Sequence, residues 1–417
     1  MTLGFFTKKE TQLTERPDGK RLSCVSCGLY KGDLKHPKLA ATGNFKKGIL
    51  NIGEFTTAWD DRKGKQFQSK QDAILFETYK KLGIDLKEDC LNVNAVMCNP
   101  YNHKTGKPRV PTAHEIQCCR LKMLALIMQH KPKVIVIFGK VALESVIGHR
   151  WRKGLGTMTK WRGWAIPDQY YKAWVTPVFS PSYVSSQDSA AVQLIWEQDL
   201  QQAIKHFDKP FRKFVEPKIT VLEKNLKELG TIKNMTKCAF DYETTGLKPH
   251  AKGQKIICCS IADSVEHVFV FMLLNKKMEP ISEKKLKPFK TFLINKYIPK
   301  CAQHLKFEEN WTYHKFRIHV KGWWHDTMYY SHIFDNRTGI TGLKFQAYVC
   351  FGIDAYDENV ANYIKAKDSN SLNKMIKFVS TKRGKDACLT YCAWDSILEL
   401  RLALLQEEWL TERVLPF

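Results

Sequence analysis

Short apolar runs alternate with amphipathic stretches over the first half of the chain. Each run has the length of a buried strand, and in the stretches between and after them apolar positions recur at helical spacing. The pattern predicts strands at 48–53, 91–96 and 134–139, and helices at 72–82, 113–129 and 190–206. Buried strands with helices between them indicate a mostly parallel α/β sheet.

The second half has a different order of elements. A polar, lysine-rich segment at 208–237 has the composition of a linker, with one short helix expected at 221–229. Beyond it the pattern predicts strands at 238–241, 256–261 and 268–272, then helices at 283–295, 308–316 and 386–409. Strands followed by helices indicate a mixed α/β domain. The expected organisation is therefore an extension at 1–21, a domain at 22–207, a linker at 208–237 and a second domain at 238–417.

Composition narrows the class of protein. The 417 residues suffice for two or three domains, and no apolar run is long enough to cross a bilayer. The net charge of +24 favours a nucleic-acid partner, with a solvated basic surface as the alternative. Because the first residues lack the pattern of a secretory signal, we expect a cytoplasmic protein. Its 13 cysteines then indicate metal or cluster ligation before disulfides.

Acidic residues in the second half are spaced for metal binding. Asp241 and Glu243 follow the apolar start of the strand predicted at 238–241. In extended backbone, residues two apart point to one face. Oxygen ligands of this kind suit Mg²⁺ or Mn²⁺. Tyr391 and Asp395 are four apart in a predicted helix and project from one side. Glu308 supplies a further carboxylate, and each pattern taken alone is also common on ordinary surfaces.

The order of these motifs is more specific than any one of them. Phe240-Asp241-Tyr242-Glu243, then His304-Leu305-Lys306-Phe307-Glu308, then Tyr391-Cys392-Ala393-Trp394-Asp395 resembles the DnaQ-like 3′–5′ exonucleases of DEDDy type. The most similar pattern is that of the proofreading domain of family A DNA polymerases. This resemblance implies a ribonuclease H-like fold and two Mg²⁺ or Mn²⁺ ions. It also implies hydrolysis at a 3′ end, with metal ligands at Asp241, Glu243, Glu308 and Asp395 and with Tyr391 positioning the water.

The second motif departs from the family pattern. That pattern reads Asn-Leu-Lys-Tyr-Asp, whereas this chain has a glutamate, one methylene longer, at Glu308. A displaced metal would slow the reaction, because an error of about 1 Å can cost on the order of a hundredfold in rate. Asp326 also lies among these motifs, and we expect it to cap the following helix rather than to bind metal.

Cysteines dominate the chemistry of the first half. Cys24 and Cys27 form a CxxC pair, and Cys98 and Cys118-Cys119 follow later in the chain. With Asn94-Ala95-Val96-Met97-Cys98-Asn99-Pro100 and Glu115-Ile116-Gln117-Cys118-Cys119, residues 22–207 resemble the family 4 iron–sulfur uracil-DNA glycosylases. The resemblance implies a [4Fe–4S] cluster on Cys24, Cys27, Cys98 and Cys119, with Cys118 left over. Zinc remains the alternative, since four thiolates also suit that metal.

The glycosylase motifs of this half are incomplete. Gly53-Glu54-Phe55-Thr56-Thr57 lacks the Pro-Gly turn of the family, and Ser180 stands where the family has a histidine. A serine cannot carry the positive charge that would stabilise a departing uracil anion. Phe67 and Asn94 remain at the family's base-stacking and base-reading positions. We therefore expect Glu54, Phe67, Asn94 and Ser180 to form a vestigial pocket in a domain that holds DNA or a polymerase.

Basic and aromatic residues alternate near the middle of the first half. This combination can bind phosphates and stack on unpaired bases. The predicted nucleic-acid contacts are Arg150, Arg152, Lys160 and Arg162. The alternative is a basic loop whose tryptophans belong to the core.

The two resemblances together imply a replication or proofreading exonuclease in a bacterial or phage-infected cytoplasm. Its expected partners are DNA 3′ termini, single-stranded or on a primer–template, and a polymerase module or subunit. The chain ends about where a family A polymerase module would continue, so a fragment of a polymerase is one expectation. A non-catalytic DNA-binding scaffold and an active uracil-DNA glycosylase are the alternatives.

Overall fold

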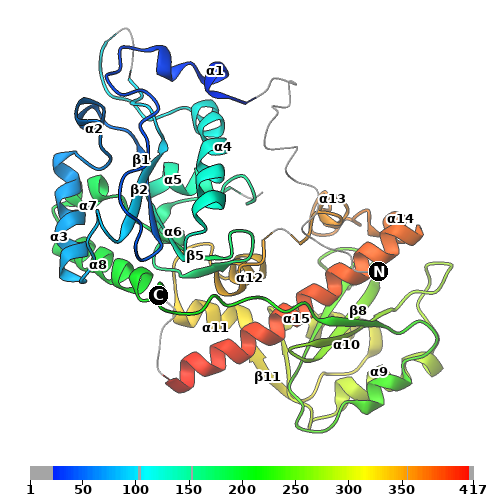
Figure 1. Ribbon diagram of the computed structural model, residues 1–417. Helices are drawn as coiled ribbons and strands as arrows, with labels where there is room; N and C mark the ends of the chain where they lie inside the picture. Colours follow the sequence, from blue (N-terminus) through cyan, green and yellow to red (C-terminus); the bar gives the residue numbers. More distant parts are fainter. Residues whose placement is uncertain (1–21, 102–104, 152–153, 355, 413–417) are drawn as a thin grey trace. The chain divides into compact units, whose positions relative to one another are not determined.

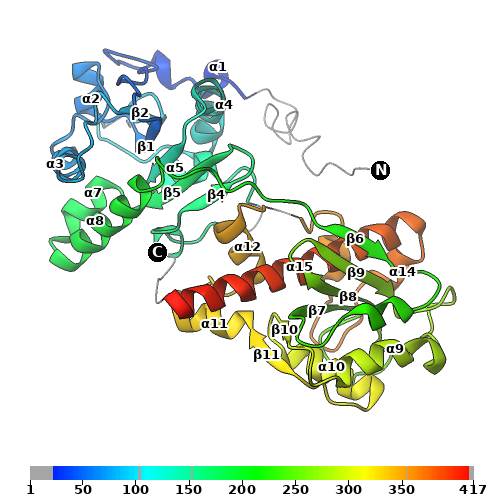
Figure 2. The ribbon, with the colours of Figure 1, turned by 60° about the horizontal axis from the view of Figure 1, so that its bottom comes forward.

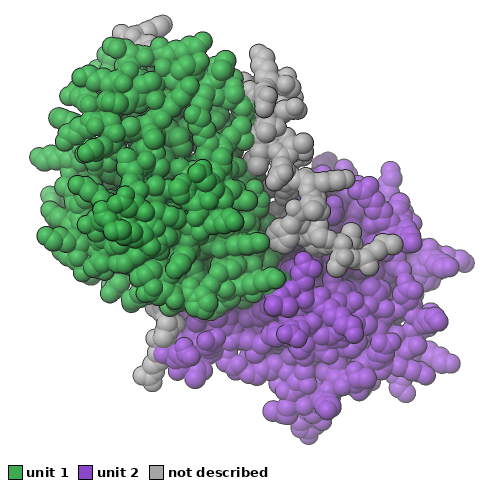
Figure 3. Space-filling view, in the orientation of Figure 1, with its two compact units in different colours: residues 1–214, 348–354, 416–417 green, residues 215–347, 355–415 purple. Residues whose placement is uncertain are grey.

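The computed structural model describes residues 22–101, 105–151, 154–354 and 356–412, and the expected extension at 1–21 lies outside this part of the chain. The chain divides into two compact units, which Figure 3 shows in different colours. Unit 1 holds the described residues up to Phe214 together with Tyr348–Asp354, and unit 2 holds Val215–Ala347 and the described residues from 356 on.

A five-stranded sheet forms the centre of unit 1 (Figure 1), in the order β2-β1-β3-β5-β4. Its strands are β1 (Ile49–Phe55), β2 (Cys90–Val96), β3 (Val134–Phe138), β4 (Ile166–Asp168) and β5 (Ala173–Val178). All neighbours run parallel except β4, which pairs antiparallel with β5. Every residue of β2, β3 and β5 is buried, which explains their continuous apolar runs.

Helices cover both faces of this sheet. They are α1 (Cys24–Cys27), α2 (Ala58–Lys63), α3 (Ala73–Lys81), α4 (Ala113–His130), α5 (Gly139–Val146), α6 (Met158–Trp161), α7 (Pro181–Gln187) and α8 (Ala190–Ile204), with short 3₁₀ turns η2 (Leu29–Lys31) and η3 (Lys70–Asp72). On one face α3 and α8 share a core with β1, β3 and β5. On the other, α4 packs on β2 and α5 on β1. The parallel α/β sheet predicted for this half is confirmed.

Unit 2 contains a six-stranded mixed sheet in the order β11-β10-β7-β8-β9-β6. Its strands are β6 (Lys218–Val221), β7 (Cys238–Thr244), β8 (Ile256–Ser264), β9 (His267–Met272), β10 (Lys300–Ala302) and β11 (Trp323–Asp326). The three consecutive strands predicted here are present as β7, β8 and β9, and they pair antiparallel. The segment from Val215 on is no free linker, because β6 pairs with β9 and belongs to the sheet.

Helices pack on both faces of the unit 2 sheet. They are α9 (Glu283–Ile294), α10 (Lys306–Phe316), α11 (Thr327–Phe334), α13 (Ala361–Ile364), α14 (Met375–Val379) and α15 (Lys382–Glu412), and η4 (Lys227–Thr231) replaces the helix expected at 221–229. The helix α12 (Leu343–Phe351) begins in unit 2, and its residues from Tyr348 on belong to unit 1. The long helix α15 crosses β7, β8 and β9 (Figure 2). Aromatic residues of α9 and α10 fill the core on the opposite face.

Strand β7 shows how the sequence pattern builds this arrangement. Phe240 and Tyr242 point into the core, where they meet Phe289 and Trp311. The alternate residues Asp241 and Glu243 therefore face α15. Within the described part of the chain, none of the helices combines the length and the apolar character needed to cross a bilayer.

Candidate active site

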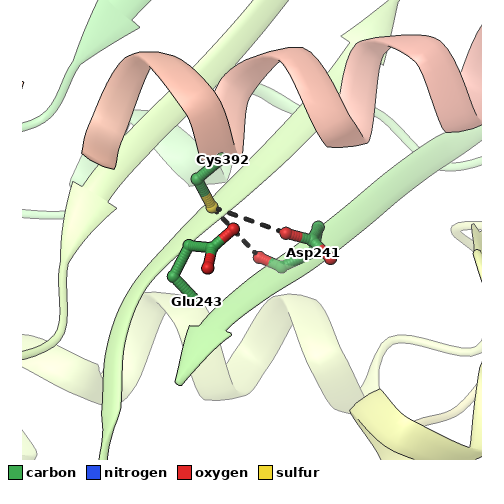
Figure 4. A group of neighbouring side chains, drawn as sticks. All are labelled: Asp241, Glu243 and Cys392. Atoms are coloured by element: carbon green, nitrogen blue, oxygen red, sulfur yellow. Dashed lines mark hydrogen bonds between the residues drawn. The ribbon is translucent and has the colours of Figure 1, made fainter. Parts of the chain in front are cut away.

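Three side chains from two elements meet where β7 faces α15. Asp241 and Glu243 come from the strand, and Cys392 comes from the helix (Figure 4). The nearest ligand atoms of the three side chains all lie within 4.8 Å of one another. The Cys392 Sγ lies 3.6 Å from the backbone oxygen of Asp241 and 3.8 Å from its Oδ2. The two-residue spacing in the strand therefore brings both carboxylates to one place, as predicted.

Tyr391 and Asp395 lie one turn apart on α15, which confirms the helix predicted around them. Asp395 Oδ1 accepts a hydrogen bond from the hydroxyl of Tyr356 at 2.5 Å. Lys344 Nζ donates to the hydroxyl of Tyr391 at 2.6 Å and lies 3.9 Å from Asp395 Oδ1. The ammonium also lies over the ring of Tyr391, 4.7 Å from its centre. The phenol and the carboxylate thus share one cation.

Two further carboxylates are buried beside this group. Glu308, in the first turn of α10, and Glu399, one turn beyond Asp395 on α15, are each 2% exposed. Among the described residues, the Oε2 atom of each has no hydrogen-bond partner. An unsatisfied buried carboxylate oxygen costs at least about 1–3 kcal/mol, so it is rare without a reason.

The electrostatics of the group show that it lacks positive charge. Burial raises the pKa of Asp241 well above its ordinary value, Asp395 raises it further, and Lys344 opposes the rise. Burial and the charge of Asp241 raise the pKa values of Glu243 and Glu308 in the same direction. A divalent cation would satisfy the unpartnered oxygens and stabilise the ionised carboxylates. The residues present therefore fit a bound cation.

Asp326 has a different role in the same region. Its Oδ1 accepts hydrogen bonds from the backbone nitrogens of Met328 and Tyr329, which begin α11. Its carboxylate also accepts from the backbone nitrogens of His304 and Leu305. The prediction that Asp326 caps the following helix is confirmed.

In unit 1 the predicted cluster ligands surround one cavity. Its lining includes five thiols, those of Cys24, Cys27, Cys98, Cys118 and Cys119. The backbone nitrogen of Lys38 donates to Cys98 Sγ at 3.3 Å, and that of Met97 donates to Cys119 Sγ at 3.4 Å. Burial raises the pKa of Cys27 to about 11 and that of Cys119 to about 12. Ionised thiolates here would need a bound cation.

Cys118 has neighbours of its own at the rim of this cavity. Its Sγ lies 3.3 Å from Ser26 Oγ and 3.6 Å from His114 Nε2. The pKa of the Cys119 thiol is raised by the charges of Cys98, Cys24 and Cys27, in decreasing order of effect. Cys118 also acts on the Cys27 thiol, so all five cysteines belong to the same cavity.

The four residues of the expected vestigial pocket lie in two pairs, Glu54 with Ser180 and Asn94 with Phe67. Glu54 Oε1 accepts from the backbone nitrogen of Val141 at 3.1 Å, and the Ser180 side chain also hydrogen-bonds this carboxyl. Asn94 Nδ2 donates to Gln66 Oε1 at 2.7 Å. The space between Asn94 and Phe67 is narrow, because a Cβ on Gly53 would lie 2.2 Å from Asn94 Oδ1 and 2.7 Å from the Phe67 ring.

Two family models match the chain, one in each half. The model described as the uracil-DNA glycosylase superfamily matches residues 40–207, and the model described as 3′–5′ exonuclease matches residues 219–404. The chain joins a glycosylase-superfamily domain to a 3′–5′ exonuclease domain. Together the two matches give the α/β and ribonuclease H-like folds that the sequence predicts.

Relatives of known function resemble the glycosylase-superfamily domain. The type-4 uracil-DNA glycosylase of Thermotoga maritima is 29% identical over 198 residues, which are 48% of this chain and 95% of that protein. The type-4 enzyme of Pyrobaculum aerophilum is 28% identical over 134 residues, which are 31% of this chain and 64% of that protein.

Solved structures show more distant similarity. NrnC of Brucella melitensis, bound to pGG, is 18% identical with a TM-score of 0.36, over 48% of this chain and 84% of that one. RNase D of Escherichia coli is 15% identical with a TM-score of 0.33, over 47% of each chain.

Three side chains of the exonuclease domain escape sequence reasoning. Lys344 and Tyr356 come from segments without a recognisable motif, and only folding brings them to Tyr391 and Asp395. Glu399 carried a usable signal, because it continues the four-residue spacing of Tyr391 and Asp395 along α15.

In the glycosylase-superfamily domain the predicted nucleic-acid contacts need correction. Arg150 is buried and forms an ion pair with Asp168 at 2.5 Å, and Arg162 holds Asp199 through two hydrogen bonds of 2.7 Å. Both guanidinium groups therefore pair with carboxylates of their own domain. Lys160 is half-buried over the rings of Trp151 and Trp161, while Arg152 lies outside the described residues.

The tryptophans of the same segment support the alternative interpretation. Trp161 is fully buried and Trp164 nearly so, and the Trp161 Nε1 donates to the backbone oxygen of Leu155 at 2.6 Å. They belong to the core, as expected of a basic loop with inward-facing rings.

Proposed function

We propose that this protein is a DNA 3′–5′ exonuclease of DEDDy type that acts in replication or proofreading. The observation that carries the proposal is the group of carboxylates between β7, α10 and α15, which contains an unpartnered buried oxygen and adjoins a tyrosine. The match to the 3′–5′ exonuclease family supports it independently. The reaction is hydrolysis of the 3′-terminal phosphodiester.

Asp241, Glu243, Glu308 and Asp395 would hold two Mg²⁺ or Mn²⁺ ions in this proposal. When bound, such ions stabilise the attacking and leaving oxygens of an in-line displacement at phosphorus. α10 supplies the buried Glu308, and the charge of Asp241 raises the pKa of its carboxyl group. The glutamate at this position is thus compatible with metal binding.

The protein's own groups then position the water. Tyr391 keeps its hydroxyl at the edge of the carboxylate group, where Lys344 donates to the phenol oxygen. That hydrogen bond occupies a lone pair of the oxygen and fixes the direction of its O–H. The hydroxyl can then orient a water toward the scissile phosphate, as the family resemblance implies. Tyr356 fixes Asp395 in the same way, through a hydrogen bond to Oδ1.

The glycosylase-superfamily domain has a different role in this proposal. It holds DNA or a polymerase and does not excise uracil, because Ser180 cannot supply the positive charge of a histidine. Asn94 and Glu54 are also engaged in hydrogen bonds within the domain, with Gln66 and with the backbone of Val141. The net charge of +24 supports binding of DNA 3′ termini by the protein as a whole.

We further propose that Cys24, Cys27, Cys98 and Cys119 hold a [4Fe–4S] cluster. A zinc ion with Zn–S bonds of about 2.3 Å needs thiolates about 3.8 Å apart. Among the described residues, no three of these sulfurs lie within 4.8 Å of one another, so the spacing favours a larger group. The backbone N–H groups that donate to Cys98 and Cys119 are typical of cluster ligands.

The exonuclease proposal is tested with a 5′-labelled single-stranded oligonucleotide and Mg²⁺. We expect a ladder that shortens from the 3′ end, that EDTA abolishes and that Asp241→Asn also abolishes. The matched control is Asp263→Asn, which changes an aspartate of β8 that pairs with His267 away from the site. Equal activity of Asp241→Asn and the wild type would overturn the assignment.

The cluster is tested by iron and sulfide analysis after anaerobic purification. We expect brown protein with about four iron atoms per chain, and loss of iron in Cys119→Ala. Colourless protein loaded with zinc would show that the alternative is correct.

A further inference from the structure

One residue beside the carboxylates, Cys392, has no role in binding magnesium. Cys392 directs its thiol at Asp241 from the face of α15 that also carries Asp395 (Figure 4). It is fully buried, and its Sγ lies 3.3 Å from Ser260 Oγ. Mg²⁺ prefers oxygen ligands, so a thiol contributes nothing to its binding. A softer metal would use it.

The distances in this group are close to those of a zinc site. Zinc binds thiolate sulfur at about 2.3 Å and carboxylate oxygen at about 2.0 Å, so tetrahedral ligation places sulfur and oxygen roughly 3.5 Å apart. Cys392 Sγ lies 3.8 Å from Asp241 Oδ2, and the Glu243 carboxylate lies within 4.8 Å of both. Small side-chain movements would bring all three onto one ion.

The surroundings independently indicate a bound cation. Glu308 is 2% exposed, and its Oε2 has no hydrogen-bond partner among the described residues. Burial and the charge of Asp241 both raise the pKa of this carboxyl group. Buried acidic oxygens without a donor are expected where a cation supplies the missing charge.

We propose that Asp241, Glu243 and Cys392 form a site for a thiophilic divalent cation, zinc in particular, that overlaps the magnesium site. On binding, the thiol releases its proton to solvent and the thiolate sulfur donates an electron pair to the metal. No redox change is involved. Because Asp241 and Glu243 serve both metals, zinc at this site displaces magnesium and inhibits the exonuclease. The inhibitory part of this inference rests on the proposed function, whereas the binding part does not.

The other role open to this thiol is that of a hydrogen-bond donor. Cys392 donates to the Asp241 backbone oxygen, and Ser260 donates back to the Cys392 backbone oxygen at 2.6 Å. Cys392→Ser separates the two roles, since a hydroxyl keeps the donor but is a poor ligand for soft metals. Cys238→Ala is the matched control, because Cys238 is a buried thiol of β7 that belongs to the opposite, apolar core.

The binding part is tested with Co²⁺ as a spectroscopic substitute for zinc in the full chain. Thiolate-to-cobalt charge-transfer absorption is measured for the wild type, Cys392→Ser and Cys238→Ala. The five cysteines of the unit 1 cavity contribute equally to all three spectra. We expect Cys392→Ser alone to lose part of the band, and to bind zinc on the order of tenfold more weakly in competition with a chelator. Identical spectra and affinities would overturn the site and leave a hydrogen-bond donor.

The inhibitory part is tested by titrating zinc into a magnesium-supported exonuclease assay, with each variant normalised to its own rate without zinc. The half-inhibitory zinc concentration should rise about tenfold in Cys392→Ser and stay unchanged in Cys238→Ala. An unchanged value in Cys392→Ser would overturn inhibition through this site. A wild type without magnesium-dependent hydrolysis would refute the proposed function and, with it, the inhibitory part, while the cobalt spectra would still decide the metal site.

Discussion

The carboxylate group of unit 2 and the glycosylase-like pocket of unit 1 are both polar clusters beside the strands of an α/β sheet, yet they differ in how their polar atoms are satisfied. In unit 2, one oxygen each of Glu308 and Glu399 is buried without a hydrogen-bond partner in the part of the chain that the structure describes. In unit 1, Asn94 bonds to Gln66, and Glu54 accepts from the backbone of Val141.

This difference indicates which of the two clusters can bind a metal or a substrate. Unpaired buried groups cost folding free energy, so they are expected mainly where a ligand or metal satisfies them. Polar groups that satisfy one another stabilise the fold and leave nothing for a substrate to bind. The comparison supports the proposal in which hydrolysis takes place in unit 2 and unit 1 holds DNA or a polymerase.

The largest expected effect comes from removing the charge of Glu308. Glu308→Gln should reduce the exonuclease rate on the order of a hundredfold or more, because a displaced metal misplaces the attacking water. The control is Glu309→Gln, which changes the next residue of α10. The Glu309 carboxylate lies outside the carboxylate group and pairs with His319 Nδ1 at a distance of 2.7 Å. Similar rates for the two variants would show that Glu308 is no ligand.

Asn94 should matter to stability and not to the exonuclease. Asn94→Ala removes a buried hydrogen bond and leaves Gln66 Oε1 without its donor, which should lower the free energy of unfolding by about 2 kcal/mol. Urea unfolding followed by circular dichroism measures the change. The exonuclease rate at a temperature where both proteins are folded should not change. A loss of activity without a loss of stability would contradict the division of roles.

Lys344 should act through Tyr391. Lys344→Met is expected to slow hydrolysis about tenfold, mainly in kcat, because the phenol loses the donor that orients it. In a Tyr391→Phe background the same substitution should have little further effect, since the two residues form one unit. Lys344→Arg should restore part of the rate. Fully additive losses in the double variant would contradict this coupling.

The smallest expected effect concerns stability in the absence of metal. The raised pKa of Glu308 means that the folded state binds more protons than the unfolded state above the ordinary carboxyl pKa. Its contribution to the free energy of unfolding is present at low pH and is lost as pH rises through the folded-state pKa. Glu308→Gln should thus stabilise the metal-free protein by about 1 kcal/mol at pH 8.

That gain should shrink toward pH 4, where the glutamate is protonated in the folded state and mostly protonated in the unfolded state. Denaturant unfolding of chelator-treated protein at the two pH values measures it. A stabilisation that does not depend on pH would indicate a packing effect and not the removal of a buried charge.

Local spacing in the sequence was sufficient to predict which side chains of the carboxylate group share a face. Asp241 and Glu243 share a face because strands alternate, and Tyr391 and Asp395 share a side because helices repeat near every fourth residue. Lys344 and Tyr356 could not be predicted, since their positions beside the site depend on how distant segments fold.

For the basic residues of unit 1, the sequence predicted a role that the structure contradicts. Arg150 and Arg162 stood in a segment rich in arginine and tryptophan, and composition alone indicated a nucleic-acid surface. Their ion-pair partners, Asp168 and Asp199, lie 18 and 37 residues further along the chain, and pairing of this kind leaves no local signal. Sequence patterns thus predicted which residues face together, and not which charges the fold neutralises.

The most direct test of the account uses one 5′-labelled single-stranded oligonucleotide with a single internal uracil. The protein is incubated with it in Mg²⁺ or in EDTA, and the products are treated with alkali and separated on a denaturing gel. The account predicts an EDTA-sensitive ladder that shortens from the 3′ end and no break at the uracil. An EDTA-resistant break at the uracil, with no ladder, would place the chemistry in unit 1 and contradict the account.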